Sequence, residues 1–516
     1  MLLHGVTGSG KTEIYTHLIQ EVRQSGGQVL YLLPEIALTT QIVKRLQKIF
    51  GNQMGVYHSK YSNNERVEVW NHVLAGKFSF VLGVRSAIFL PFDNLSLIIV
   101  DEEHETSYKQ FAAQPRYHAR DAALMLAQYH HAKVLLGSAT PAVETYYHAQ
   151  TGKYGLVSLT ERYGEAVLPT MELVNVRIAR ERKAMREDFA QTLIDALEEV
   201  LERQEQAIIF QNRRGYAPYI TCEDCAWVPM CTQCAVSLTY HQRSNHLRCH
   251  YCGYYTPMPP ACGVCDSHRL KNVSFGTEKL EETLQLFFPK KTVQRMDLDT
   301  TRGKHSYDRL IEGLEQGQID ILVGTQMVTK GLDFGRVSLV GVLGVDKLLH
   351  FPDFRAGERC FQLVTQVSGR AGRRQQPGRV IIQTANPKNP VLEAVVQYDY
   401  MHMYERELAE RREFRYPPFM RLIRIILKHR DQVLVTAAAK ALAQQLREKL
   451  GSQVLGPQTP LVSRIRQQYL MELWIKVSRD MTKANNTKAQ LRTASRQLLL
   501  DRSFKAVKVV FDVDPM

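Results

Sequence analysis

The first residues of the chain carry a glycine-rich pattern of the kind that binds nucleotide phosphates. Gly5-Val6-Thr7-Gly8-Ser9-Gly10-Lys11-Thr12 follows the apolar pair Leu2-Leu3 and matches G-x-x-x-x-G-K-[ST]. In such a loop backbone N–H groups surround the phosphates, Lys11 reaches the β- and γ-phosphates, and Thr12 offers its hydroxyl to Mg²⁺. A helix predicted over 13–22 directs its N-terminus at the same anion. The predicted cofactor-binding residues of the loop are Gly8, Ser9, Gly10, Lys11 and Thr12.

A second candidate site follows an apolar run at 97–100, where the chain reads Asp101-Glu102-Glu103-His104. A strand that ends in two carboxylates can place one near a metal ion and the other near an attacking water. We therefore expect Asp101 to hold Mg²⁺ and Glu102 to orient or deprotonate the nucleophile. Such a carboxylate can also be only a helix cap or a surface charge, but the loop upstream favours the catalytic interpretation.

A third pattern, Gln366-Val367-Ser368-Gly369-Arg370-Ala371-Gly372-Arg373, supplies two arginines three residues apart. If a helix begins here, Arg370 and Arg373 share a face and could reach a γ-phosphate as arginine fingers. That role is worth roughly 10³–10⁵ in rate. Gln366, one turn earlier, would contact the same phosphate or its water. The alternative is an ordinary basic turn.

Eight of the nine cysteines form four C-x-x-C pairs between Cys222 and Cys265. Each pair offers two thiolates on a tight turn, and two pairs complete a tetrahedral Zn²⁺ site. We therefore predict two structural zinc ions rather than disulfides or an iron–sulfur cluster. The ninth, Cys360, is expected to be a buried apolar residue.

The spacing of the four pairs favours a nested arrangement of the two zinc sites. Cys234 and Cys249 are separated by 14 residues, close to a known zinc pattern. The inner site would then hold Cys231, Cys234, Cys249 and Cys252, and the outer site Cys222, Cys225, Cys262 and Cys265. Sequential pairing of neighbouring pairs is the alternative.

Aromatic and basic residues alternate soon after the acidic strand end, at Tyr108, Lys109, Phe111 and Tyr117. This combination suits stacking on unpaired bases together with contacts to their phosphates. The alternative is that the aromatic side chains only cover a core. At other strand ends we expect contacts to a DNA backbone from Arg85, Ser86, Thr325 and Gln326.

The elements that must position these residues alternate between apolar strands and helices. Region 1–165 is predicted to contain strands at 28–33, 78–82, 97–100 and 134–136 and a helix at 35–50. This order is typical of an α/β domain with a parallel sheet, whose ligands bind at the carboxyl ends of the strands. A second α/β region, 190–412, has predicted strands at 207–210, 319–323 and 378–384 and one helix at 389–412.

The last hundred residues are predicted to form a compact α+β domain. Its strands are expected at 420–427, 469–477 and 506–513 and its helices at 433–450 and 482–500. From 415 to 516 there are 19 Lys and Arg against 7 Asp and Glu, so this stretch carries +12 of the net charge of +14. A basic module of this kind indicates a polyanionic partner such as nucleic acid, and Arg464, Arg466, Lys476 and Arg479 are candidate phosphate contacts.

The composition of the 516-residue chain allows about three domains and excludes a membrane protein. No apolar run approaches the length of a membrane span, and the first ten residues lack the features of a signal peptide. We expect a cytoplasmic protein without a membrane partner.

Taken together, these patterns resemble motifs I, II, III, V and VI of superfamily 2 helicases. Motif III corresponds to Gly137-Ser138-Ala139-Thr140, and motif V to the stretch from Gly324 to Gly331, which includes Lys330 as a further DNA contact. Leu33-Pro34-Glu35-Ile36-Ala37-Leu38-Thr39 and Asn212-Arg213-Arg214-Gly215 extend the match. With the cysteine cluster, the chain resembles the family of primosomal protein N′, the bacterial replication-restart helicases.

The resemblance implies two RecA-like lobes that hydrolyse ATP with Mg²⁺ and unwind DNA in the 3′→5′ direction, rebuilding stalled or collapsed replication forks. It implies the nested zinc pairing and an aromatic-rich loop that couples single-stranded DNA to hydrolysis. Implied partners are forked and single-stranded DNA, single-strand-binding protein, other primosome proteins and the replicative helicase loader. Family members usually have Thr where this chain has Val84, so one phosphate contact is expected to be missing.

The resulting domain prediction follows the order of the motifs. We expect helicase lobe 1 at 1–165, a linker and the start of lobe 2 at 166–220, a zinc-binding insertion at 221–270, the rest of lobe 2 at 271–412 and a basic C-terminal domain at 413–516. In the family, DNA-binding domains precede the phosphate loop. The sequence therefore predicts a truncated helicase with a clipped first strand, weak ATP affinity and poor fork specificity.

Two other functions remain open on the sequence. One is a different superfamily 2 motor, such as a double-strand translocase or an RNA helicase. The other is a zinc-bearing scaffold that binds forks and recruits partners with little turnover.

Overall fold

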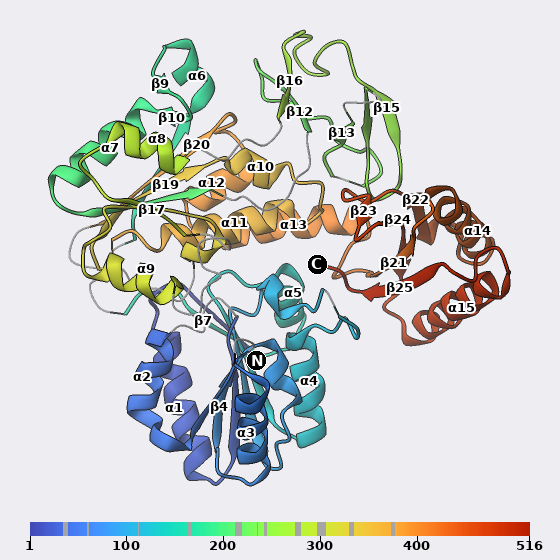
Figure 1. The fold of residues 1–516 in the computed structure, drawn as a ribbon, viewed down its shortest axis with the longest axis horizontal. Coiled ribbons are helices and arrows are strands. Elements are labelled where there is room, and N and C mark those ends of the chain that lie inside the picture. Colours follow the sequence, from blue (N-terminus) through green and yellow to red (C-terminus); the bar gives the residue numbers. More distant parts are fainter. Residues whose placement is uncertain are drawn as a thin grey trace. The chain divides into compact units, whose positions relative to one another are not determined.

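A computed structural model describes residues 1–34, 40–58, 61–111, 113–163, 168–211, 219–234, 236–241, 245–273, 280–296, 306–329, 335–372 and 377–516 (Figure 1). The chain divides into two compact units. The first contains Met1–Arg213, Thr277–Val345 and Glu358–Tyr400, and the second contains Arg214–Gly276, Asp346–Gly357 and Met401–Met516. Within the described ranges no helix combines the length and the apolar character needed to cross a membrane.

The first unit begins with a parallel sheet in the strand order β3-β4-β2-β5-β6-β1-β7. Its strands are β1 Leu2–Gly5, β2 Gln28–Leu32, β3 Met54–Tyr57, β4 Phe80–Gly83, β5 Leu95–Asp101, β6 Lys133–Ser138 and β7 Leu156–Leu159. Strands β2 and β4 are buried along their whole length, as expected for strands covered on both faces. The associated helices are α1 Lys11–Gln24, α2 Thr40–Phe50, α3 Asn63–Leu74, α4 Ala119–His130 and α5 Val143–Gln150.

The predicted elements of this sheet are confirmed. Strand β1, which leads into the phosphate loop, spans Leu2–Gly5 and pairs in parallel with β6 on one side and β7 on the other. Its position between β6 and the edge strand β7 fixes the start of the phosphate loop. The predicted helix at 35–50 is described from Thr40 onward, and residues 35–39 lie outside the described residues.

A second parallel sheet in the same unit has the order β17-β18-β11-β19-β20-β8. Its strands are β8 Thr170–Asn175, β11 Gln206–Gln211, β17 Val293–Met296, β18 Ile321–Gly324, β19 Val337–Leu343 and β20 Arg379–Thr384. Its helices are α7 Gln191–Glu202, α8 Leu280–Phe287, α9 Ser306–Glu315, α11 Ala356–Ser368 and α12 Pro390–Val396. A small hairpin, β9 Met185–Arg186 with β10 Phe189–Ala190, and helix α6 Val176–Glu181 follow β8. Its core combines α7 with β11, β18 and β19, and together the two parallel sheets confirm the predicted α/β class.

The single helix predicted at 389–412 is instead two helices, α12 and α13 Tyr400–Glu413. Tyr398 between them has a φ of 55°, a left-handed conformation that ends a helix. Its hydroxyl donates to the carbonyl of Pro169 at 2.9 Å. Apolar periodicity continues through this break, which is why the sequence pattern does not reveal it.

The second unit contains the cysteine-rich region and the C-terminal domain. The cysteine-rich region has the antiparallel pair β12 Tyr219–Cys222 and β16 Leu270–Val273 and the three strands β13 Thr239–His241, β14 His246–Arg248 and β15 Tyr255–Pro257. The C-terminal sheet, in the order β22-β24-β21-β25, is antiparallel. It comprises β21 Arg421–His429, β22 Val454–Gln458, β23 Arg464–Ile465, β24 Gln468–Val477 and β25 Lys508–Val513, with helices α14 Gln432–Leu450 and α15 Met481–Leu500. The predicted α+β domain is thus confirmed.

The cysteine-rich region and the C-terminal domain share one hydrophobic core. Cys231, Cys234 and Cys249 are buried in a cluster with Tyr416 and Trp474. The Tyr251 ring stacks on Trp474 with centroids 4.6 Å apart, and the Tyr416 hydroxyl donates to the carbonyl of Cys234 at 3.0 Å. The region is inserted in the sequence of lobe 2, but it packs in the unit of the C-terminal domain.

Candidate active site and metal centres

The phosphate loop connects β1 to α1 and has the backbone its glycines require. Gly8 and Gly10 have φ values of 83° and 85°, the left-handed region that favours glycine. Gly10 directly precedes α1, and no side chain caps that helix end, so the first N–H groups of α1 are available to an anion. A Cβ at Gly5 would come within 2.6 Å of Ser9 Oγ, which explains the glycine at that position.

Lys11 and Ser9 show that this loop fits a nucleotide. Lys11 Nζ donates to the carbonyls of Gly5 at 2.6 Å and Val6 at 3.3 Å, which holds the ammonium group inside the loop. Ser9 Oγ is buried and has no hydrogen-bond partner among the described residues. A cationic side chain, an orphaned hydroxyl and a helix N-terminus together suit an anionic phosphate chain.

The carboxylate of Asp101 lies at the end of β5 and is held by two tyrosines. Tyr15 donates to Oδ1 at 3.1 Å and Tyr31 to Oδ2 at 3.2 Å. The backbone N–H of Glu102 donates to Oδ1 at 3.1 Å. Burial raises the pKa of Asp101 to about 6, with a further rise from the charge of Glu102, while Lys11 and the hydrogen bonds from Tyr15 and the Glu102 N–H lower it.

Sequence reasoning missed Tyr15 and Tyr31. Both are buried, and burial raises the pKa of each phenol well above its ordinary value, so both remain donors. A Cβ at Gly137 would come within 1.7 Å of the Tyr15 hydroxyl, so the motif III glycine leaves room for this contact. A buried tyrosine needs a hydrogen-bond partner, and that requirement was the available signal. With Thr12, Asp101 would hold Mg²⁺, which when bound neutralises phosphate charge.

The raised pKa of Asp101 gives a pH-dependent prediction for stability. Because the folded-state pKa lies above the ordinary value of 3.8, the folded protein binds more protons between about pH 4 and pH 6, and stability falls as pH rises through this window. Without nucleotide, Asp101→Asn should therefore be more stable than wild type by about 1–3 kcal/mol at pH 7.5. The gain should vanish below pH 4. Thermal melting from pH 4 to 8 checks this, and an equal gain at every pH would contradict it.

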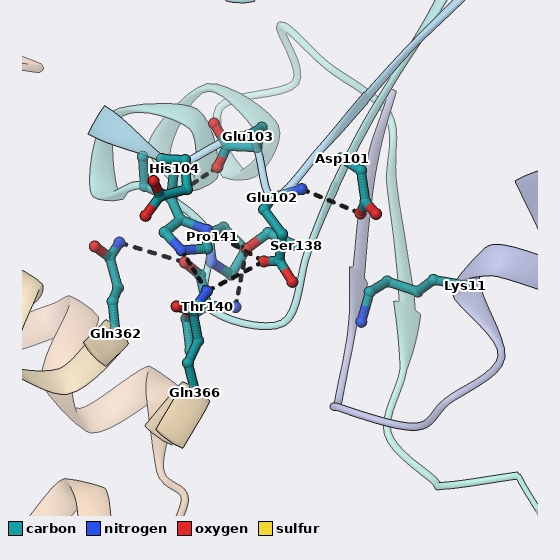
Figure 2. Close-up of polar contacts among 12 residues, drawn as sticks. Lys11, Asp101, Glu102, Glu103, His104, Ser138, Thr140, Pro141, Gln362 and Gln366 are labelled. Carbon is teal, nitrogen blue, oxygen red and sulfur yellow. Dashed lines mark hydrogen bonds and ion pairs between the residues drawn. The ribbon is translucent and has the colours of Figure 1, made fainter. Parts of the chain in front are cut away.

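Figure 2 shows the turn after β5 meeting residues of α11. Gln366 Nε2 donates to His104 Nε2 at 2.9 Å and to Glu102 Oε2 at 3.4 Å. His104 Nδ1 lies 2.8 Å from Ser138 Oγ, which also accepts the N–H of Thr140 at 3.0 Å. Glu102 is therefore contacted from the second sheet, and Gln366 lies against the expected catalytic carboxylate and its neighbour.

Of the two predicted arginine fingers, Arg370 is described, and it follows α11 and does not begin a helix. Helix α11 ends at Ser368, and Arg370 lies in the turn that follows. The condition for a shared helical face, a helix that begins at this segment, is not met in the described residues 369–372, so that face gives no support for the role. Arg373 lies outside the described residues, and the finger role of both arginines stays a prediction.

The expected DNA-contacting residues separate into buried and exposed groups. Tyr108 is fully buried, and its hydroxyl donates to the carbonyls of Asp101 at 2.7 Å and Leu32 at 3.0 Å. Lys109 is also buried, and its Nζ donates to the carbonyl of Arg116 at 2.9 Å. Neither side chain can reach DNA in this conformation, so these two predictions are corrected. Phe111 is 44% exposed and remains available for stacking.

An aromatic pair and an arginine lie beside this segment. Tyr117 packs edge-on against the exposed Phe89, with centroids 4.8 Å apart, and sequence reasoning missed Phe89. Arg85 donates to the carbonyls of Ser107 and Lys109, each at 3.0 Å, and with Ser86 it lines a small hollow next to Tyr108. Thr325 and Gln326 follow β18 as expected, and Lys330 lies outside the described residues. Their DNA contacts stay predictions.

The cysteines form the two predicted sets of four, and the nested pairing is confirmed. Within Cys222/Cys225/Cys262/Cys265 and within Cys231/Cys234/Cys249/Cys252 all sulfurs lie within 4.8 Å of one another. Within a set, sulfurs that belong to different C-x-x-C pairs lie 3.4–3.7 Å apart. This is close to the roughly 3.8 Å between ligands in a tetrahedral zinc thiolate site. Backbone N–H groups donate to Cys249, Cys252 and Cys262 sulfurs. Both sets therefore fit Zn²⁺.

Four family models match successive parts of the chain. They are described as DEAD/DEAH box helicase at residues 1–148, PriA DNA helicase Cys-rich region (CRR) domain at 231–257, Helicase conserved C-terminal domain at 267–375 and Primosomal protein N C-terminal domain at 412–516. Their order agrees with the two parallel sheets, the cysteine sites and the basic domain.

Curated relatives match all or nearly all of the chain. The replication restart protein PriA of Bacillus subtilis is 42% identical over 516 residues, covering 100% of this chain and 63% of the relative. The protein of the same name from Haemophilus influenzae is 39% identical over 519 residues, covering 100% of this chain and 69% of the relative. That from Rickettsia felis is 36% identical, covering 92% and 73%. The chain thus spans less than two thirds of the first of these relatives.

Proposed function

The chain belongs to the replication restart protein PriA family, and from this premise we propose that it is an ATP-dependent 3′→5′ DNA helicase. It would recognise stalled or collapsed replication forks, unwind the duplex and initiate primosome assembly. The observation that carries the motor function is the contact of Gln366 with Glu102 and His104. This contact joins the second sheet's helix to the carboxylate turn of the first, as a motor with a nucleotide between two lobes requires.

Residues of both sheets' domains would divide the chemistry among them. Lys11 and the loop N–H groups would bind the phosphates, and Asp101 with Thr12 would hold the metal. Glu102 would orient the attacking water, with Gln366 fixing its carboxylate. Arg370 and Arg373 would stabilise charge on the transferred phosphate.

DNA would be bound by the exposed aromatic side chains and by the C-terminal domain. Arg464 lies over the Tyr469 ring at 4.9 Å next to a hairpin turn at Arg466, so both arginines are placed at the end of a hairpin. Lys476 and Arg479 donate to the carbonyls of Phe414 and Pro418, and phosphate contacts from these two side chains stay part of the proposal. We propose a cytoplasmic location, with single-strand-binding protein, other primosome proteins and the helicase loader as partners.

The direction of movement can be tested with tailed duplexes. We expect ATP-dependent strand separation of a duplex with a 3′ single-stranded tail, and at least tenfold less with a 5′ tail. ATP hydrolysis that responds to duplex DNA without strand separation would favour a double-strand translocase. A preference for RNA tails would favour an RNA helicase, and fork binding without turnover would favour the scaffold.

A further inference from the structure

Helix α11 presents three buried polar side chains at four-residue intervals. Glu358, Gln362 and Gln366 are only 3%, 6% and 7% exposed. Residues four apart share one face of a helix, so they form a continuous polar row along α11. Of the three, only Gln366 belongs to the Q-x-x-G-R-x-G-R pattern, and the other two have no assigned role.

The first of these residues, Glu358, holds the start of a helix in the first sheet's domain. Its Oε1 accepts the N–H of Val143 at 2.9 Å. Val143 is the first residue of α5, and the preceding Ala142 provides no side-chain cap. The N–H of Ala142 donates to Glu103 Oε1 at 2.7 Å. Two carboxylates, one from each lobe, therefore satisfy consecutive N–H groups at this helix end, where negative charge is favourable.

The second residue, Gln362, connects this helix end to motif III. Its Nε2 lies 3.3 Å from the carbonyl of Thr140 and 3.3 Å from Glu358 Oε1. Figure 2 shows Gln362 and Gln366 reaching from α11 toward the Thr140 and His104 turns. The row thus contacts the turns after β5 and β6, which are the two turns that carry motifs II and III.

We propose that Glu358 and Gln362 are positioning residues that set the register of α11 against the turn from Thr140 to Val143. Through the same helix they hold Gln366 against Glu102 and His104. Loss of the Glu358 or the Gln362 side chain would let α11 shift. Glu102 would then stay in place but lose its contact with the Gln366 amide. The consequence for turnover rests on the proposed ATP hydrolysis, whereas the contact itself does not.

Steady-state kinetics distinguishes an effect on turnover from an effect on nucleotide binding. In Glu358→Ala we expect DNA-stimulated kcat for ATP to fall about tenfold while KM stays within about twofold, because no residue of the phosphate loop is touched. Glu358→Gln keeps an oxygen that accepts the Val143 N–H and should retain at least one third of wild-type kcat. Glu393→Ala, which removes an exposed glutamate of α12, is the matched control. An equal loss in the Gln and Ala variants, or a change in KM alone, would overturn the proposal.

A double-mutant cycle tests the contact without using ATP hydrolysis. Proline is tolerated at the first position of a helix, and Ala142 has φ −64° and ψ 139°, which suits a residue before proline. Val143→Pro therefore removes the N–H that donates to Glu358, whereas Val143→Ala shortens the side chain but keeps this N–H. Thermal melting without nucleotide reports each variant.

Glu358→Ala should lower the melting temperature both in the wild-type protein and in the Val143→Ala variant. In the Val143→Pro variant, the decrease in melting temperature caused by Glu358→Ala should be less than one third as large. The same effect in all three backgrounds would overturn the proposed contact. If wild-type protein lacks ATP hydrolysis while the cycle shows this coupling, the proposed function fails and the contact stands.

Discussion

Replacing Lys11 with Ala should reduce ATP hydrolysis by about 10²–10³, the usual effect of removing one group that stabilises developing charge. The Lys11 ammonium group is held by the carbonyls of Gly5 and Val6 inside the phosphate loop, from which it can reach the phosphates. The expected loss lies in turnover and nucleotide affinity, whereas DNA binding should stay within about twofold. Steady-state hydrolysis and fluorescence anisotropy on a forked DNA measure the two effects separately.

The same variant discriminates between motor and scaffold. Lys48→Ala, which removes an exposed lysine of α2, provides a control for charge. If the Lys11→Ala variant still assembles partners at a fork and supports replication restart, the result favours the scaffold function and contradicts an obligatory motor. If both variants lose hydrolysis equally, the assignment of Lys11 to the phosphate site is wrong.

The sequence predicts those parts of the site that depend on local pattern. The phosphate loop needs glycines at fixed positions, as at Gly8 and Gly10, and the zinc sites need C-x-x-C turns at a given separation. Buried parallel strands are near-continuous apolar runs, so β2 and β5 are visible in the sequence. For these features the chemistry and the spacing lie in one short stretch.

The parts that the sequence does not reveal depend on contacts between distant segments. Nothing near Glu358 indicates that it holds the N–H of Val143, 215 residues away. The sequence predicts Tyr108 to be a stacking residue because it lies close to Phe111. In the structure its hydroxyl instead donates to the carbonyls of Leu32 and Asp101. A pattern shows which chemistry a side chain can perform, and only packing decides whether that side chain is exposed.

The packing of the cysteine-rich region was also unforeseen. The segment Asp346–Gly357 joins the second unit, where Phe354 stacks on Tyr416 with centroids 4.2 Å apart. Arg355 in this segment donates to the carbonyl of Pro515 at 3.1 Å. The segment runs directly into α11, which contacts the carboxylate turn. A covalent connection therefore leads from the zinc-bearing unit to the helix that contacts Glu102.

Loss of the inner zinc site should have the largest effect on folding. We expect Cys249→Ser to remove one of the two zinc ions and to destabilise the second unit strongly, since a structural zinc supplies on the order of 10 kcal/mol of folding free energy. Cys249 is fully buried in the core that includes Trp474 and Tyr416. DNA binding and unwinding should be lost, while ATP hydrolysis in the absence of DNA should change less than threefold.

Two tryptophans allow the inner and outer sites to be read separately. Trp474 stacks on Tyr251 beside the inner site, and a Cβ at Gly263, next to an outer ligand, would lie 3.0 Å from Trp227. In a protein whose only tryptophan is Trp474, Cys249→Ser should shift the emission to longer wavelength. Cys265→Ser, at an exposed ligand of the outer site, should leave that emission unchanged.

The converse pair of measurements uses Trp227 as the only tryptophan, whose emission should respond to Cys265→Ser and not to Cys249→Ser. Zinc content should fall from two to one per chain in both variants, and Cys360→Ala, which removes the cysteine outside the two sets, should keep two. If both zinc variants changed Trp474 equally, the two sites would form one folding unit. The inner site would then not be the specific support of the C-terminal domain.

A chelator provides a further test of the zinc-bearing unit. If it abolished unwinding and DNA-independent hydrolysis to the same extent, this would contradict a zinc-bearing unit that acts on DNA rather than on the nucleotide.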